Sequence, residues 1–176
     1  IYATQVYIPG AAPAITQGPH STHFDNGAEL LALCESNNLS IGTVMQRREK
    51  ILRPEADSEK EMTRVLNVMR QEVHDTIENP RASIGGLLFG QAQATANTSP
   101  AIIDALMGPV QTRAVAFAMA VLERSATMGI IVAAPTAGAS GVVPGSILAV
   151  AEHIHATDDQ ILLALWNAAA LGAILS

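Results

Sequence analysis

The chain contains 176 residues, of which 49% are hydrophobic, 15% charged and 3% aromatic, and its formal net charge is −6. This balance excludes a disordered chain and argues against a nucleic-acid partner, because neutralising phosphates requires clustered Lys and Arg. The one cysteine, Cys34, excludes both an internal disulfide framework and a metal site built from several thiolates of these residues.

The first 24 residues contain β-branched residues followed by Pro, Gly and His, and they show no helical period. This pattern predicts the end of a strand and then an extended linker, so we assign residues 1–24 to the end of a preceding domain and its linker. The character changes at Asp25, and residues 25–176 are predicted to form a helical domain.

Two short helices are predicted next. The first is capped by Asp25 or Asn26 and closes at Asn37-Asn38, and the second is capped by Ser40 and stops at Pro54. The second helix has one apolar face, and we expect its charged residues to face water. These residues are Arg47, Arg48, Glu49 and Lys50.

The clearest helix signal follows. Ser58 and Glu61 match the capping-box pattern, and a single apolar stripe runs from Met62 to Ile77 before Pro80. We expect the polar residues near the end of this helix to form a solvated face. These residues are His74, Asp75 and Glu78.

A glycine-containing connection over residues 83–90 leads to Ser99-Pro100, a good cap and first-turn pair for a short helix that ends at Gly108. A longer helix is predicted from Gln111 to Met128, with Gly129 as its left-handed cap. The β-branched run at residues 130–132 is too short to establish a sheet.

An irregular loop over residues 135–141 precedes a helix that begins near Pro144, and Thr157 with Gln160 caps a last helix. Residues 161–176 carry no charge, but a membrane span needs about 20 apolar residues, so we expect a core helix and no membrane partner. The sequence thus predicts an all-α protein of six to eight helices behind an extended linker.

The loop that leads into the helix near Pro144 is the segment most suited to chemistry. Its Thr136 and Ser140 place hydroxyls beside the amides of a helix start, a setting that suits a carboxylate or phosphate. The alternative is a tight helix-to-helix connection that needs positive φ at Gly138 and Gly141.

Residues 134–145, APTAGASGVVPG, resemble the signature loop of the iron-sulfur-dependent L-serine dehydratases, also called L-serine ammonia-lyases, in their α-domain. We call this segment the signature loop. Residues 24–34, FDNGAELLALC, are similar to the segment where single-chain members of that family pass from the β-domain into the α-domain. The two stretches occur in the order that the family requires, and the resemblance covers most of residues 24–176.

The resemblance implies an all-α catalytic domain of a cytoplasmic, usually dimeric lyase of amino-acid catabolism and gluconeogenesis, which converts L-serine to pyruvate and ammonia. It implies a 4Fe-4S cluster held by three cysteines, with one iron free to take the serine hydroxyl. By the same resemblance, the substrate binds at Pro135, Thr136, Ala137, Gly138 and Gly141.

One position departs from the family pattern. Ser140 aligns with a cluster cysteine, and a serine oxygen is a harder and less acidic ligand than a thiolate, so these residues alone are not expected to bind the cluster. The family's other cluster cysteines belong beyond Ser176, which predicts a domain truncated at its C-terminus. The expected partners are L-serine and either a second copy or the missing domains of the same enzyme.

Two other interpretations compete with this one. The first is a non-catalytic helical domain that binds a small amino acid or a partner chain. The second, a pyridoxal-phosphate dehydratase, is disfavoured because Schiff-base chemistry needs a lysine in a dry pocket, whereas Lys50 and Lys60 lie among charges. Cys34 is expected to be a core thiol, since no cationic neighbour is evident to activate it. The sequence does not indicate the catalytic base.

Overall fold

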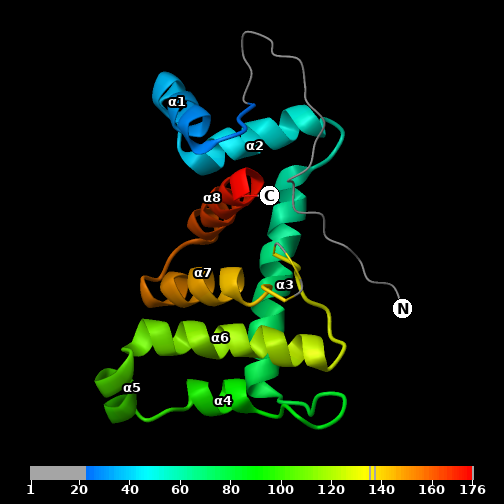
Figure 1. Cartoon of the computed structure of the whole chain (residues 1–176), viewed down its shortest axis with the longest axis vertical. Coiled ribbons are helices and arrows are strands. Elements are labelled where there is room, and N and C mark those ends of the chain that lie inside the picture. The colour runs from blue at the N-terminus through cyan, green and yellow to red at the C-terminus, as the bar shows by residue number, and fades with distance from the viewer. Residues whose placement is uncertain (1–22, 135, 137, 176) are drawn as a thin grey trace. The chain divides into compact units, whose positions relative to one another are not determined.

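A computed structural model describes residues 23–134, 136 and 138–175 of the chain. These residues form eight α-helices and no strand, which confirms the predicted all-α class (Figure 1). The predicted strand end and linker, apart from its last two residues, lie outside the described residues. The helices are α1 (Gly27–Asn37), α2 (Ile41–Leu52), α3 (Ser58–Glu78), α4 (Gln91–Ala96), α5 (Pro100–Leu106), α6 (Pro109–Ala126), α7 (Val142–His153) and α8 (Asp158–Leu175).

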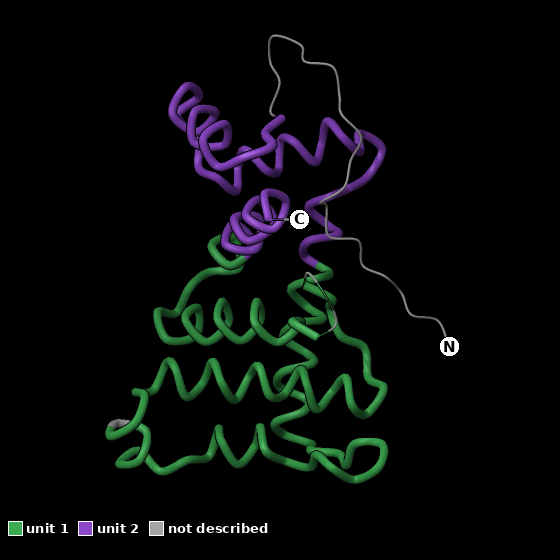
Figure 2. Tube along the Cα trace, viewed as in Figure 1, with its two compact units in different colours: residues 1–6, 64–161 green, residues 7–63, 162–176 purple. Residues whose placement is uncertain are grey.

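The chain divides into two compact units (Figure 2). Of the described residues, 64–161 form unit 1, and 23–63 together with 162–175 form unit 2. The divisions fall inside α3 and α8, and the signature loop belongs entirely to unit 1.

Unit 2 is built around one cluster of apolar side chains from α1, α2 and α8. Phe24, which precedes α1, is buried in this cluster, and Cys34 packs against it as a half-buried thiol. The buried members are Phe24, Leu30, Val44, Met45, Trp166, Ala169 and Ala170. Removing this apolar surface from water stabilises the unit.

The predicted helix starts are largely confirmed. Asn26 caps α1 by accepting the Glu29 N–H, and Ser40 caps α2 by accepting the Thr43 N–H. For α3 the prediction is wrong by one residue: the carboxyl of Asp57 accepts the Lys60 N–H at 3.1 Å, so Ser58 is already inside the helix. A carboxylate also suits the positive end of the helix dipole.

The water-facing assignment on α2 is wrong for two of the four residues. Arg48 and Glu49 are buried, whereas Arg47 and Lys50 are exposed as predicted. The Arg48 guanidinium stacks over the Phe24 ring at 4.4 Å, a cation–π contact that compensates for its burial. The Glu49 carboxylate accepts a bond of 3.2 Å from Arg53, and burial raises the pKa of Glu49.

Helix α8 is long and apolar enough to cross a membrane by length and composition, and it is the one such helix among the described residues. A core helix of a soluble protein satisfies the same criterion. Its residues Trp166, Ala169 and Ala170 belong to the apolar cluster of unit 2, and 28% of the helix is buried among the described residues.

In unit 1, α6 lies between α4 and α7 (Figure 1). Helix α4 was not predicted, because its N-cap residue, Gly90, has no side chain with which to cap. The predicted left-handed cap at Gly129 is also wrong. Met128 takes the left-handed conformation, with φ 60°, and the Gly129 N–H bonds to the Arg124 carbonyl. A Cβ at Gly129 would instead collide with the Arg124 side chain.

The packing of α2 on α8 generates a test of unit 2. A Cβ added to Gly42 would lie 2.7 Å from Leu163 Cδ1 and 2.8 Å from the Leu163 carbonyl oxygen. Gly42→Ala is therefore expected to lower the free energy of unfolding by about 1–3 kcal/mol, measured by urea denaturation. The control is Gly172→Ala in α8, where a Cβ meets nothing within 4 Å, and it should stabilise by about 0.5–1 kcal/mol. Equal effects of the two substitutions would contradict this packing.

Candidate functional site

The signature loop ends where α7 packs directly on the backbone of α6. A Cβ added to Gly141 would lie 2.6 Å from the Ala118 carbonyl oxygen, and one added to Gly145 would lie 2.8 Å from the Ala114 carbonyl oxygen. Real Cβ atoms do not approach backbone oxygens so closely, so both positions require glycine for space.

This finding corrects the reason for glycine at one predicted position. Gly141 has φ −78° and ψ −18°, an ordinary right-handed conformation that any residue adopts. The positive φ expected there is therefore absent, and the close approach to α6 is what excludes a side chain at Gly141.

Upstream of Gly141 the loop forms a hydroxyl-supported turn. The Thr136 hydroxyl oxygen accepts the Ala139 N–H at 3.2 Å, and the Ala139 carbonyl accepts the Val142 N–H at 3.0 Å. Thr136 and Gly138 are exposed, whereas Ser140 is buried, with 3% of its surface exposed. The turn thus brings Thr136, Gly138 and Gly141 to the start of α7, while Pro135 and Ala137 lie outside the described residues.

A buried carboxyl on α3 reaches the segment just before the signature loop. Glu72 Oε2 accepts the Val132 N–H at 3.1 Å, and both residues are buried. Burial is the main cause that raises the pKa of Glu72 to about 8, opposed by the Val132 hydrogen bond and by the charge of Arg124. Glu72 is therefore mostly protonated at neutral pH.

Glu72 is not among the site residues predicted from the sequence, although its position on α3 indicates a buried side chain. Val65, Met69 and Thr76 are buried on the same helix, and Glu72 lies between Met69 and Thr76 at spacings of three and four residues. A carboxyl placed on the apolar stripe of a helix indicates a buried, hydrogen-bonded group. The predicted stripe contains only apolar residues, although buried polar residues share its face.

A second buried carboxyl, Glu123 on α6, caps α4. Its Oε1 accepts the Ala92 N–H at 3.1 Å, and so supplies the cap that Gly90 lacks. Beside it lies a hollow of about 10 Å³, which is room for a single water molecule. Its lining residues are Thr76, Asn79, Arg81, Glu123, Arg124 and Thr127.

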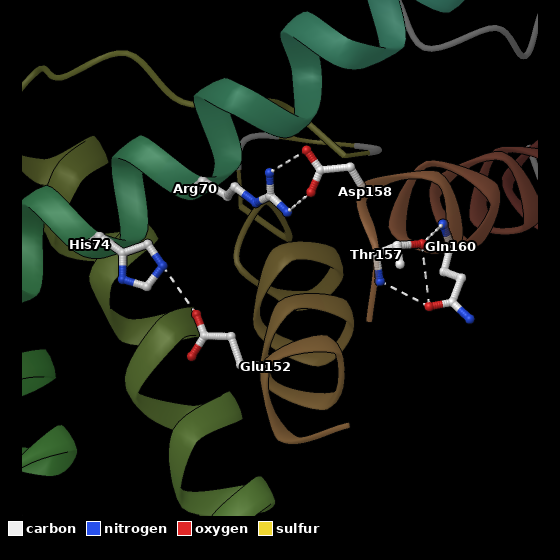
Figure 3. Close-up of polar contacts among 6 residues, drawn as sticks. All are labelled: Arg70, His74, Glu152, Thr157, Asp158 and Gln160. Carbon is white, nitrogen blue, oxygen red and sulfur yellow. Dashed lines mark hydrogen bonds and ion pairs between the residues drawn. The ribbon is translucent and has the colours of Figure 1, made fainter. Parts of the chain in front are cut away.

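The predicted solvated face of α3 is wrong for two residues. Asp75 accepts a bond of 2.8 Å from Arg124, a residue of α6. His74 pairs with Glu152 of α7 at 3.1 Å (Figure 3). It also packs edge-on against the Phe117 ring. Both side chains face neighbouring helices because they lie next to the buried stripe. Glu78 is exposed, as predicted.

Ion pairs also hold the far end of α7 and the start of α8 within unit 1. Glu152 accepts a bond of 2.7 Å from Arg113 as well as the His74 contact. Arg70 binds Asp158 through two bonds of 2.6 and 3.2 Å (Figure 3), and this pairing lowers the pKa of Asp158. The predicted capping box is present, since the Gln160 side chain accepts the Thr157 N–H at 2.9 Å.

The donor groups of these residues do not fit a three-thiolate cluster. The sequence contains one cysteine, and Cys34 belongs to unit 2, whereas the signature loop belongs to unit 1. Across the described ranges, no group of three or more His, Cys, Asp and Glu side chains could hold a metal ion. Lys50 and Lys60 are exposed, so neither provides the dry pocket that a Schiff base needs.

The chain is similar in sequence to known proteins. A family model described as serine dehydratase alpha chain matches residues 36–176, and no solved structure matches significantly. A probable L-serine dehydratase alpha chain from Bacillus subtilis is 34% identical over 158 residues, which are 87% of this chain and 51% of the relative. An L-serine dehydratase from Streptomyces coelicolor is 30% identical over 86% of this chain and 33% of the relative. The chain thus spans about half the length of the first relative and less of the second.

Glycine at the start of α7 can be tested by substitution. Gly141→Ala is expected to destabilise the chain by about 1–3 kcal/mol in urea denaturation, because the methyl group meets the Ala118 carbonyl of a rigid helix. Gly138→Ala is the matched control within the same loop, since a Cβ there meets only the Thr136 hydroxyl, at 3.9 Å. A loss of stability in the control as large as in Gly141→Ala would contradict the close approach as the cause.

The buried Glu72 carboxyl generates a pH prediction. Its pKa is about 8 in the folded chain against an ordinary 4.5, so the folded state holds a proton that the unfolded state releases. Its contribution to stability is full below pH 4.5 and is lost as the pH rises to 8, at about 1.4 kcal/mol per pH unit. Glu72→Gln mimics the neutral carboxyl and removes this slope.

The measurement is urea denaturation of the parent chain and of Glu72→Gln between pH 5 and 9. The difference in free energy of unfolding should grow with pH in favour of the variant. A difference that is constant with pH would show that Glu72 titrates normally.

Proposed function

Because the chain belongs to the serine dehydratase alpha chain family, we propose that it is the substrate-binding part of an L-serine dehydratase. The reaction of such a lyase removes the α-proton and the β-hydroxyl of L-serine as water. The enamine product becomes an imine, and hydrolysis of that imine returns the water and releases pyruvate and ammonia.

One observation carries this proposal. The family match spans the signature loop, and this loop ends at positions where glycine is required for contact with a neighbouring helix. Because the loop packs closely against a rigid helix, its hydrogen-bond donors are held in fixed positions. Recognition of a small substrate requires such positioning.

The loop's own groups suggest how serine is held. The Thr136 hydroxyl is exposed and lies within hydrogen-bond distance of the Ala139 amide at the entrance to α7. Such a turn suits the carboxylate of an amino acid, because hydroxyl and amide donors near a helix start favour an anion. In this proposal, Thr136 and the neighbouring amides orient the substrate, with Gly138 leaving room for it.

The family resemblance also implies an iron-sulfur cluster, which would act as a Lewis acid on the leaving hydroxyl. The one cysteine of this chain and the serine at position 140 do not provide its ligands. We therefore propose that these residues supply substrate binding, and that the full activity requires thiolates that they do not contain.

The proposal includes partners. The relative from Bacillus subtilis is named as an alpha chain, which is the nomenclature of an enzyme with more than one kind of chain. We propose association with a second copy or with further domains of the same enzyme, in the cytoplasm. The scarcity of cysteine is compatible with that reducing compartment.

A second candidate function is binding of a small amino acid without catalysis. The residue in its favour is Ser140, which by the family resemblance replaces a cluster cysteine and which is buried in the structure. Both candidates require the signature loop to bind L-serine, and they differ in whether pyruvate is formed.

Binding is tested by titration calorimetry with L-serine at millimolar concentration. Thr136→Val should weaken binding about tenfold, because it exchanges the hydroxyl for a methyl group that cannot form a hydrogen bond. Thr136→Ser retains the hydroxyl and should bind as the parent does. Thr63→Val, on the exposed surface of α3, is the control and should also bind normally. Absence of heat with the parent chain would contradict the proposal.

Catalysis is tested separately. Protein purified without oxygen is assayed for iron and sulfide and for pyruvate formed from L-serine. Serine binding together with pyruvate supports the lyase, whereas serine binding without iron, sulfide or pyruvate supports the second candidate.

A further inference from the structure

The segment that enters the signature loop is extended, and its backbone makes few hydrogen bonds. Residues 130–134 form no helix or strand, and Val132 and Ala134 point into the core, whereas Ala133 is exposed. Within the part of the chain that the structure describes, the Val132 N–H is the one backbone group of this segment with a hydrogen-bond partner. That partner is Glu72 Oε2, at 3.1 Å.

Burial of the Glu72 carboxyl at this position costs free energy. Its exposed fraction is 1%, and its second oxygen, Oε1, is buried without a hydrogen-bond partner in the described structure. An unsatisfied buried polar atom destabilises a protein, and an apolar side chain of the same volume would avoid this cost. The one hydrogen bond that this carboxyl makes in the described structure goes to the segment that leads into the loop.

We propose that Glu72 is a positioning residue that fixes the signature loop by holding the Val132 amide against α3. Three residues of chain separate Val132 from Thr136, so the place of Val132 limits where the turn can lie. The consequence for substrate binding rests on the proposed function, but the positioning itself does not.

The groups around Glu72 are compatible with a neutral acceptor. Arg124 of α6 is the charged residue that acts on it, and Arg124 is itself paired with Asp75 of α3. Burial favours the protonated carboxyl, whose carbonyl oxygen still accepts the Val132 N–H. Glutamine presents the same acceptor at the same distance from the backbone, so it should retain the positioning.

The chain provides a matched control. Glu123 is buried to the same degree, with 3% exposed, and its Oε1 accepts one backbone N–H at 3.1 Å while Oε2 has no partner in the described structure. The amide that it holds belongs to Ala92 of α4 instead of the loop segment. Replacing either carboxyl removes the same kind of bond from a different segment.

The experiment is amide hydrogen exchange, followed by mass spectrometry, on the ligand-free chain. Glu72→Met should accelerate exchange about tenfold in peptides covering residues 130–134, with little change in α4. Glu123→Met should give the opposite pattern, with faster exchange in α4 alone. Glu72→Gln should restore the parent pattern, which a purely space-filling role for Glu72 does not require.

Two outcomes would overturn the proposal: unchanged exchange at residues 130–134 in Glu72→Met, or a uniform rise over all helices of unit 1. Should Glu72→Met fail to fold, Glu72→Asp makes the same test, because it keeps a carboxyl and withdraws it by one methylene group. Since no ligand is present, failure here leaves the serine titration unaffected. Failure of that titration likewise leaves the exchange result valid.

Discussion

A carboxyl group that accepts a backbone N–H inside the protein is the interaction on which unit 1 depends. The extended segment before the signature loop has no neighbouring strand, and α4 has no cap of its own. Glu72 and Glu123 supply the missing acceptors from two long helices. Buried backbone amides must be paired. An irregular segment therefore remains inside a helical unit only where side chains supply the hydrogen bonds that a neighbouring strand would otherwise provide. In the described structure, the second oxygen of each carboxyl is buried without a hydrogen-bond partner.

The signature loop is therefore constrained from two directions. Glu72 holds the chain that enters it, and the glycines of α7 fix the chain that leaves it against α6. Between these two anchors the Thr136 turn is exposed. This combination of rigid ends and an accessible turn is the arrangement that small-molecule recognition needs, because the donors lose little freedom when a ligand binds.

The sequence predicted most helices but not the polar contacts between them. Helices with strong local signals, such as α3 with its long apolar stripe or α8 with its capping box, follow from neighbouring residues alone. Helix α4 does not, because the carboxyl that caps it lies 31 positions away in the chain. The same limit applies to Arg48, whose burial depends on a ring from before α1. For the candidate site, residue types predicted the loop, whereas the spatial reason for Gly141 and the role of Glu72 required tertiary structure.

The close packing of α7 on α6 also restricts the register of the two helices. Gly141 faces Ala118 and Gly145 faces Ala114, so two pairs of small residues, each four positions apart, run in opposite directions along the two helices. Sliding α7 by one turn to put Gly145 over Ala118 would bring Ala149 to Ala114, where the backbone oxygen leaves no room for a methyl group. This one-turn slide of α7 along α6 is therefore sterically unfavourable. We expect adjustment of the loop to a ligand to come from rotation of backbone dihedrals before Gly141 and not from this translation of the helix.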